Sequence, residues 1–267
     1  MAARLSAPVP LPPGWADLLT DAAWRRDEAG QAGAIVHRLT MKDGSAVYLK
    51  HGTGRVADDV TDEAVRLRWL AGRLPAPGLK LFACDADAAW LLSDALPGLT
   101  AEAWLEREPA RLPVIVRSLA GFLRRLHALP TDECPFDAGY AVQLAAARRN
   151  VAAGAVDEDD FDAERRGWTA ASVLARAERA VPETAARVVT HGDFSLGNVL
   201  LDEAGAVTGC IDVGRLGVAD PHRDIAVLWG GLAAFGDAAT ALLTQELGVG
   251  TLDEERIRFH QLLDELF

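Results

Sequence analysis

The sequence predicts an α+β protein with two lobes, a small N-terminal lobe with an antiparallel sheet and one helix, and a larger, mainly helical C-terminal lobe. The first third of the chain shows strand patterns with one helical pattern, and the segments after Pro97–Gly98 are mostly helical. A chain of 267 residues with 50% hydrophobic content is long enough to build two closely packed lobes. We expect an N-terminal lobe at residues 1–94, a hinge at 95–99 and a C-terminal lobe at 100–267.

The N-terminal lobe is expected to contain a hairpin, a helix and two further strands. Residues 34–39 and 46–50 are apolar runs on either side of Asp43–Gly44, a pair that is typical of a tight hairpin turn. Residues 58–73 carry apolar side chains at helical spacing, which predicts the single helix of this lobe. The remaining expected strands are residues 79–84 and 90–93.

The C-terminal lobe is expected to begin with helices and to include a second hairpin. An apolar stripe over residues 112–126 predicts a long helix that ends near Pro130. Residues 187–190 form a short apolar run that predicts a strand. The runs 198–201 and 207–211 flank a polar segment with a glycine, which is the pattern of a hairpin.

Composition narrows the classes of ligand and the compartment. The formal net charge of −12 disfavours a nucleic acid or an anionic membrane as partner and favours a cationic ligand, although acidity can also serve solubility alone. Three scattered cysteines suggest reduced thiols and a cytosolic protein. The proline-rich start lacks the apolar core of a signal peptide, and the longest apolar run, 225–235, is too short to span a bilayer. We expect a soluble, cytoplasmic monomer or weak dimer.

One short segment of the C-terminal lobe carries the strongest chemical indication. His191–Gly192–Asp193 follows a strand, Asn198 lies five positions past the aspartate, and Asp212 follows the second hairpin. Phosphoryl transfer needs a group that orients the acceptor and takes its proton, together with metal ligands beside the phosphate oxygens. Asp193 is therefore the candidate catalytic base, with Asn198 and Asp212 as ligands of Mg²⁺. The protein-kinase signature has a similar arrangement, so the expected fold is protein-kinase-like. The alternative is a solvated polar loop.

The N-terminal lobe offers a partner for a nucleotide. Lys50 ends an alternating strand, and Glu63 follows thirteen residues later within the expected helix. A lysine on such a strand can hold the α- and β-phosphates of ATP while a helix glutamate fixes its direction. Taken alone, each residue would be an ordinary surface charge. Together with the downstream segment they indicate an ATP site.

Two runs of the chain resemble one family closely. His191 to Asn198, with the sequence HGDFSLGN, and Ile211 to Asp220, with the sequence IDVGRLGVAD, are similar to the aminoglycoside 3'-phosphotransferases, bacterial resistance enzymes with the protein-kinase fold. The ending LLDELF resembles theirs too, and the similarity covers nearly the whole chain. The resemblance implies ATP and Mg²⁺ as cofactors and an aminoglycoside as substrate.

Further nucleotide contacts follow from the resemblance alone. Ala32 lies in the turn that would cover the phosphates, where many relatives carry a serine, so a backbone contact is expected there. Tyr48 matches an aromatic residue that stacks on adenine in some relatives, and a buried strand tyrosine is the alternative. Ser93 and Ala95 lie in the segment whose main-chain groups would meet the adenine edge.

The acceptor side should present carboxylates, because aminoglycosides carry several ammonium groups. The acidic run 157–162 and the chain end fit this need, and an acidic run can also be a solvated loop. Apolar residues at helical spacing between 259 and 266 would dock the last helix and hold the chain end in place. Arg215 could contact the substrate or form a structural ion pair. The residues that the resemblance implies for the substrate are Asp160, Asp162, Arg215, Asp264, Glu265 and the terminal carboxylate of Phe267.

The combined prediction is an ATP-dependent kinase that phosphorylates the 3'-hydroxyl of kanamycin-type or neomycin-type aminoglycosides. Gly230–Gly231 departs from an Arg–Asp pair of some relatives, which bears on the antibiotics that fit. His191 is interpreted as a structural residue of the loop, and Asp220 as a cap or loop anchor. Two alternatives stay open: a kinase of the same fold for a macrolide, choline or a sugar amine, and a nucleotide-binding pseudokinase. The segment after Asp212 lacks an Ala-Pro-Glu sequence, which disfavours a protein kinase.

Overall fold

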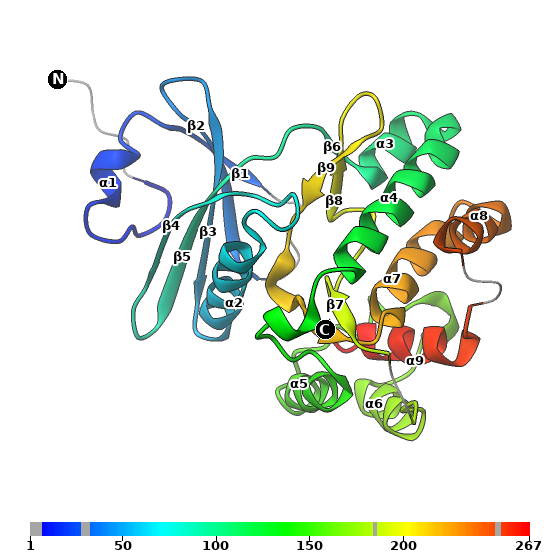
Figure 1. Ribbon diagram of the computed structural model, residues 1–267. Helices are drawn as coiled ribbons and strands as arrows, with labels where there is room; N and C mark the ends of the chain where they lie inside the picture. The colour runs from blue at the N-terminus through cyan, green and yellow to red at the C-terminus, as the bar shows by residue number, and fades with distance from the viewer. Residues whose placement is uncertain (1–6, 28–32, 184–185, 249–251) are drawn as a thin grey trace. The chain divides into compact units, whose positions relative to one another are not determined.

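The computed structural model divides the chain into two compact units (Figure 1). The first unit comprises Met1–Pro97 and Gly209–Gly214, and the second comprises Gly98–Thr208 and Arg215–Phe267. The short segment that carries Asp212 is therefore part of the first unit, although it lies more than a hundred residues further along the chain. The structure describes residues 7–27, 33–183, 186–248 and 252–267.

The first unit is built on an antiparallel sheet of five strands in the order β1-β2-β3-β5-β4. The strands are β1 (Ala23–Asp27), β2 (Ile35–Thr40), β3 (Ala46–Thr53), β4 (Leu79–Cys84) and β5 (Ala88–Asp94). The helices of this unit are α1 (Trp15–Leu18) and α2 (Arg55–Leu70). The expected hairpin, helix and two later strands are confirmed. Strand β1 and helix α1 were not anticipated, because β1 is an edge strand with mostly exposed side chains and α1 is a single turn.

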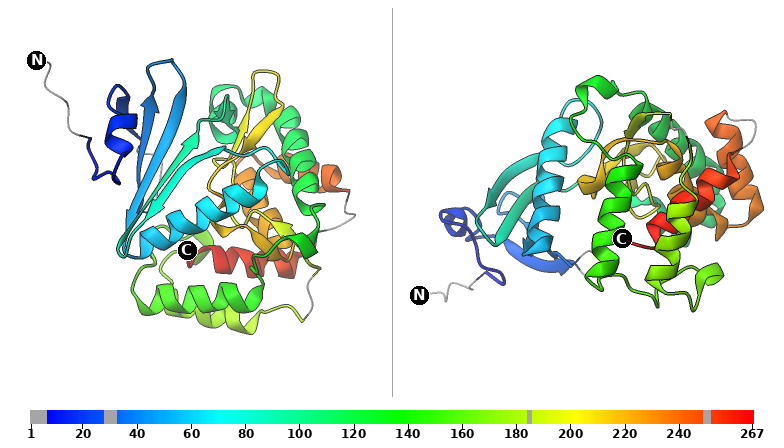
Figure 2. Two further views of the ribbon diagram at one scale, coloured as in Figure 1. Left: turned by 60° about the vertical axis from the view of Figure 1, so that its left-hand side comes forward. Right: turned by 90° about the horizontal axis from the view of Figure 1, so that it is seen from below.

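The two faces of this sheet are covered by different segments. On one face, Leu39, Leu49 and Trp90 pack with Val9 and Trp15 of the segment that precedes β1. The indole Nε1–H of Trp90 also donates a hydrogen bond of 2.8 Å to the Pro10 carbonyl. On the other face lies α2, which packs against β3 and β5 (Figures 1 and 2). Side chains alternate along β3, so the residues that point to the α2 side are not the ones that pack with Val9 and Trp15.

The second unit is mainly helical and contains two small sheets. Its helices are α3 (Ala101–Arg107), α4 (Leu112–His127), α5 (Tyr140–Ala152), α6 (Ala170–Arg179), α7 (His222–Ala233), α8 (Asp237–Leu247) and α9 (Glu254–Asp264). The short strands are β6 (Leu99–Thr100), β7 (Val188–Thr190), β8 (Val199–Leu201), β9 (Val207–Cys210) and β10 (Gly217–Ala219), and β9 continues into the first unit. Strand β7 pairs with β10, and β8 lies between β6 and β9. The predicted α+β fold class is confirmed.

Apolar packing in the second unit holds the chain end. The stripe on α4 is buried from Ile115 to Leu126. Helix α9 packs against α5 and α6 through Phe259, Leu262 and Leu263, and Leu266 is also fully buried. The prediction that the last helix docks through this stripe is confirmed. Within the described ranges, none of the helices combines the length and the apolar character needed to cross a membrane.

Candidate active site

The catalytic loop follows β7 and is organised by local hydrogen bonds. The Asn198 amide donates from Nδ2 to both the backbone oxygen and the Oδ2 atom of Asp193, each at 3.0 Å. The backbone N–H of Asp193 donates to Nδ1 of His191 at 3.3 Å. His191 is fully buried, which agrees with a structural role, whereas Asp193 is only partly buried. A partly exposed carboxylate is thus held in one orientation at the surface of the loop.

Gly192 lies where the loop passes close to another segment. Its φ is +90°, in the left-handed region that favours glycine. A Cβ atom at this position would lie 2.4 Å from the backbone oxygen of Arg215. Any side chain would therefore push the loop and the Arg215 segment apart, which explains why an arginine at this place, as in protein kinases, is incompatible with this backbone.

Asp224 supports the catalytic loop, and the sequence analysis did not identify it. It is fully buried in α7 and accepts hydrogen bonds from the backbone N–H groups of His191 (2.9 Å) and Gly192 (2.8 Å). His127 of α4 contacts it through Nε2 at 2.9 Å. Burial alone would raise the pKa of Asp224, but the hydrogen bond with His127 and the charges around it keep the pKa below its ordinary value. An acidic residue directly before the longest apolar run of the chain was the signal that could have revealed it.

In the first unit, Lys50 joins two carboxylates. Its ammonium lies 2.7 Å from Glu63 of α2 and also forms an ion pair with Asp212. Burial would lower the pKa of Lys50, yet the charges of Glu63 and Asp212 raise it above its ordinary value, so the ammonium stays charged. Asp212 has a φ of 55°, the one positive value for a non-glycine residue in the part of the chain that is described. Such a strained backbone is typical of functional positions.

The residues expected at the adenine differ in their availability. Tyr48 is half-buried and lies two residues before Lys50 in β3, so both side chains point to the same face of the sheet. Ser93 is buried within β5 and lies opposite Tyr48 in register. The backbone N–H of Ala95 donates to the Ala46 carbonyl at 3.1 Å, so an adenine contact by Ala95 would have to use its carbonyl group. Ala32 lies outside the described residues.

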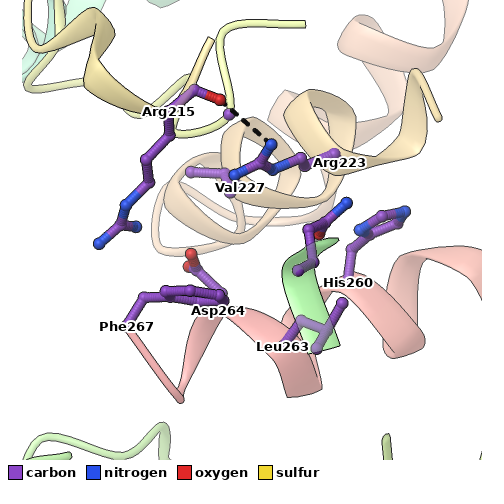
Figure 3. Close-up of a pocket in the computed structure, with 9 residues that line it drawn as sticks. Arg215, Arg223, Val227, His260, Leu263, Asp264 and Phe267 are labelled. Carbon is purple, nitrogen blue, oxygen red and sulfur yellow. Dashed lines mark hydrogen bonds between the residues drawn. The ribbon is translucent and has the colours of Figure 1, made fainter. Parts of the chain in front are cut away.

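A small recess, partly open to solvent, lies beside the catalytic loop in the second unit (Figure 3). Asp264 points into it from the end of α9, and Arg215 and Arg223 lie across from it, with Arg223 donating to the Arg215 backbone oxygen at 3.2 Å. Its lining residues are Gln143, Gly192, Arg215, Arg223, Val227, His260, Leu263, Asp264 and Phe267.

Asp264 is the carboxylic acid of this recess, and its acidity is altered. Part of the residue is exposed, but protein atoms surround its carboxyl group, and this burial raises the pKa of Asp264 to about 6. The carboxylate of Asp193 raises it further, whereas Arg215 opposes the rise. A cation that enters the recess would be attracted to this carboxylate and would favour its ionised form.

The chain end and Arg215 lie together. The guanidinium of Arg215 lies over the ring of Phe267, 5.0 Å from its centroid, so Arg215 forms a structural contact with the last residue. Asn150 of α5 donates to the Leu266 carbonyl at 2.8 Å. Two segments thus hold Leu266 and Phe267 beside the recess. Asp220 anchors the start of α7, because it accepts hydrogen bonds from the N–H of His222 and from Arg256.

The acidic loop meets the chain end through a residue that was not anticipated. Asp162 and Glu265 both contact Arg165, which is buried between them. Asp160 is exposed, and neither it nor Asp162 is among the lining residues of the recess. Of the six residues expected to bind the substrate, the structure brings Arg215, Asp264 and Phe267 together in the recess and links Asp162 to Glu265 beside it.

Comparison with known proteins places this arrangement among characterised relatives. A model of the phosphotransferase enzyme family matches residues 23–260. An aminoglycoside 3'-phosphotransferase from Escherichia coli is 46% identical over 245 residues, which make up 91% of this chain and 90% of that protein.

Solved structures are similar over the same extent. The crystal structure of an aminoglycoside-3'-phosphotransferase of type VIII has a TM-score of 0.84 and 41% identity, and the match covers 92% of this chain and 94% of that one. The aminoglycoside phosphotransferase APH(3'')-Id from Streptomyces rimosus, in complex with ADP and streptomycin, has a TM-score of 0.82 and 32% identity over 94% of this chain and 96% of that chain.

Proposed function

This chain belongs to the phosphotransferase enzyme family, and we propose that it transfers phosphate from ATP to the 3'-hydroxyl of aminoglycoside antibiotics and so confers resistance to them. The observation that carries the proposal is the position of Asp193, whose carboxylate is held by Asn198 in the loop beside the recess that contains Asp264. The 3'-position is supported by the similarity to the Escherichia coli enzyme at 46% identity. The reaction is a phosphoryl transfer to an alcohol, for which positioning and charge stabilisation are the main contributions of the protein.

The nucleotide half of the reaction is assigned to the first unit. Lys50, oriented by Glu63, holds the α- and β-phosphates of ATP. Tyr48, on the same face of β3, packs on the adenine ring, and main-chain groups of Ser93 and Ala95 contact its edge. The bound ADP in the Streptomyces rimosus structure supports an adenine nucleotide as the donor.

Mg²⁺ is assigned to Asn198 and Asp212 on the chemistry of their atoms. The amide and carboxylate oxygens that they offer are the hard donors that Mg²⁺ prefers, and Mg²⁺ usually takes only one or two carboxylates together with phosphate oxygens. Among the described residues there is no cluster of three or more His, Cys, Asp or Glu side chains that would form a larger metal site. When bound, the ion neutralises charge on the phosphate oxygens.

The acceptor half of the reaction is assigned to the second unit. Asp193 orients the 3'-hydroxyl and accepts its proton as the new phosphate ester forms. The ammonium groups of the antibiotic bind the Asp264 carboxylate in the recess, which Phe267 also lines, and the carboxylates of Asp160 and Asp162 on the adjoining loop. The net charge of −12 favours such a polycation over an anionic ligand.

The cellular setting is part of the same proposal. ATP is a cytoplasmic donor, and the sparse cysteines suit a reducing compartment, so the protein acts in the cytoplasm. It acts as a monomer or weak dimer.

The proposal is tested by assaying purified protein with ATP and a kanamycin-type antibiotic, and by locating the phosphate with ³¹P and ¹H NMR. The matched control substrate is the 3'-deoxy analogue, which keeps the ammonium groups but lacks the acceptor. Phosphate on the 3'-oxygen and no turnover of the analogue are expected. Phosphate on another hydroxyl, or turnover only of a macrolide, choline or a sugar amine, would refute the 3'-assignment. Binding of ATP without transfer to any acceptor would point to a pseudokinase.

A further inference from the structure

Arg165 occupies an unusual place between the acidic loop and the end of the chain. Only 7% of the residue is exposed, although the three residues before it are exposed. Its Nε donates to Glu265 at 2.5 Å, and its second terminal nitrogen donates to Asp162 at 2.7 Å. The backbone N–H of Asp162 also donates to the Glu265 carboxylate at 3.1 Å. Three groups from two distant segments therefore form one closed network.

The two carboxylates in this network differ in exposure. The Glu265 side chain is 7% exposed and is engaged by both Arg165 and the Asp162 backbone. The Asp162 side chain is 67% exposed, so it can contact a ligand while it remains bonded to the guanidinium. A buried ion pair has a high desolvation cost and is weak evidence for a gain in stability. A guanidinium that bonds one carboxylate on each side, however, fixes the relative position of the two segments that carry them. The network is better suited to positioning than to stabilisation.

Charge repulsion within the acidic loop gives the contacts of Arg165 a purpose. Residues 157–162 contain five carboxylates within six positions, which repel one another. Glu158 anchors one end, because its carboxylate accepts a hydrogen bond from the Ala170 N–H at the start of α6. Arg165 supplies the counter-charge at the other end and links it to Glu265.

Glu265 connects this network to the recess. It directly follows Asp264, which points into the recess, and it precedes Phe267 by two residues. The backbone N–H of Phe267 donates to the Asp264 carbonyl at 3.1 Å, so the last residues form one turn. A fixed Glu265 thereby limits the movement of the residues on either side of it.

We propose that Arg165 is a positioning residue for the acceptor: it clamps the acidic loop to the chain end, so that the carboxylates of both segments form one preorganised frame for a polycationic antibiotic. The inference rests on the proposed function. Loss of the clamp leaves the loop to be ordered at the moment of binding, which raises KM for the aminoglycoside by about ten-fold or more. KM for ATP and kcat should change by less than about three-fold, because Asp193 and Lys50 lie outside the network.

The experiment compares Arg165→Met with Arg165→Lys, Glu265→Gln and the double variant Arg165→Met/Glu265→Gln. Methionine keeps an apolar stem of similar length but removes the guanidinium. Lysine keeps the charge without the two-pronged geometry, so it should rescue KM only in part. If both side chains act through their mutual contact, the double variant should be no worse than Arg165→Met. Arg148→Met is the matched control, since it removes an exposed ion pair with Glu178 between α5 and α6.

The outcomes separate the clamp from the proposed function. An inactive wild-type protein would refute the proposed function and this inference with it. With an active wild type, an unchanged or lowered KM for the aminoglycoside in Arg165→Met would overturn the clamp alone. Equal losses in both KM values and in kcat, together with a lower Tm, would show a merely structural role and overturn it as well. If Arg165→Met does not fold, Arg165→Lys and Glu265→Gln decide by the same criteria.

Discussion

Gly192→Ala should damage both stability and catalysis, because two separate costs arise at this position. The φ of +90° is unfavourable for alanine, at about 1–2 kcal/mol. The new Cβ would lie 2.4 Å from the Arg215 backbone oxygen, and relief of such an overlap costs about 1–3 kcal/mol. A total near 3 kcal/mol would lower Tm by about 6–12 °C in a protein of this size.

A matched control isolates the steric part. Gly14 has a φ of +82° in the left-handed region, but a Cβ there would meet nothing within 4 Å. Gly14→Ala should therefore lose only the conformational part, about 1–2 kcal/mol. Thermal unfolding measured by calorimetry compares the two variants directly.

The activity of Gly192→Ala tests the same geometry. The displaced loop carries Asp193, and a shift of about 1 Å at a reacting group can lower turnover by about a hundred-fold. Gly14 lies at the start of α1, so its variant should keep normal kcat. Equal losses of Tm in the two variants, or normal kcat in Gly192→Ala, would refute the close-contact explanation.

Three further predictions address the chemistry of the two units. Asp193→Asn should lower kcat by about 10²–10⁴-fold and leave the Kd for ATP unchanged in calorimetric titration, and near-normal turnover would contradict its role as base. Glu63→Gln removes one of the two carboxylates that hold Lys50, so KM for ATP should rise several-fold while KM for the aminoglycoside stays constant; equal changes would contradict the assignment. The raised pKa of Asp264, about 6, means that the carboxyl is protonated below that pH and charged above it. Since a cation binds the charged form, KM for the aminoglycoside should rise as the pH falls below about 6, and Asp264→Asn should flatten this profile; a flat wild-type profile would contradict the role of Asp264.

Local patterns predicted the parts of this structure that depend on neighbouring residues. The strand at Leu79–Cys84 was expected with the observed bounds, since its apolar run stands between turn residues. The helix expected at 58–73 instead runs from Arg55 to Leu70. It ends before Gly72, whose φ of +78° is incompatible with further helix. The hydrogen bonds between Asn198 and Asp193 also lie within reach of a sequence argument, because five positions separate the two residues.

The supporting contacts could not be read from the sequence because they join distant segments. Asp224 contacts the catalytic loop from 32 and 33 positions away, and Arg165 contacts Glu265 across 100 positions. Neither pairing follows from spacing. The altered acidity of Asp264 likewise depends on how closely protein surrounds it, which only the folded chain defines.

The segment that covers the face of the five-stranded sheet opposite α2 has a practical consequence for protein engineering. Its proline-rich composition suggests a dispensable tail, yet Val9, Trp15 and Leu19 shield an apolar surface that would otherwise meet water. Removal of this segment would leave an exposed apolar patch that favours self-association. Tags for purification or immobilisation should therefore be joined ahead of this segment, with Val9 to Leu19 left intact.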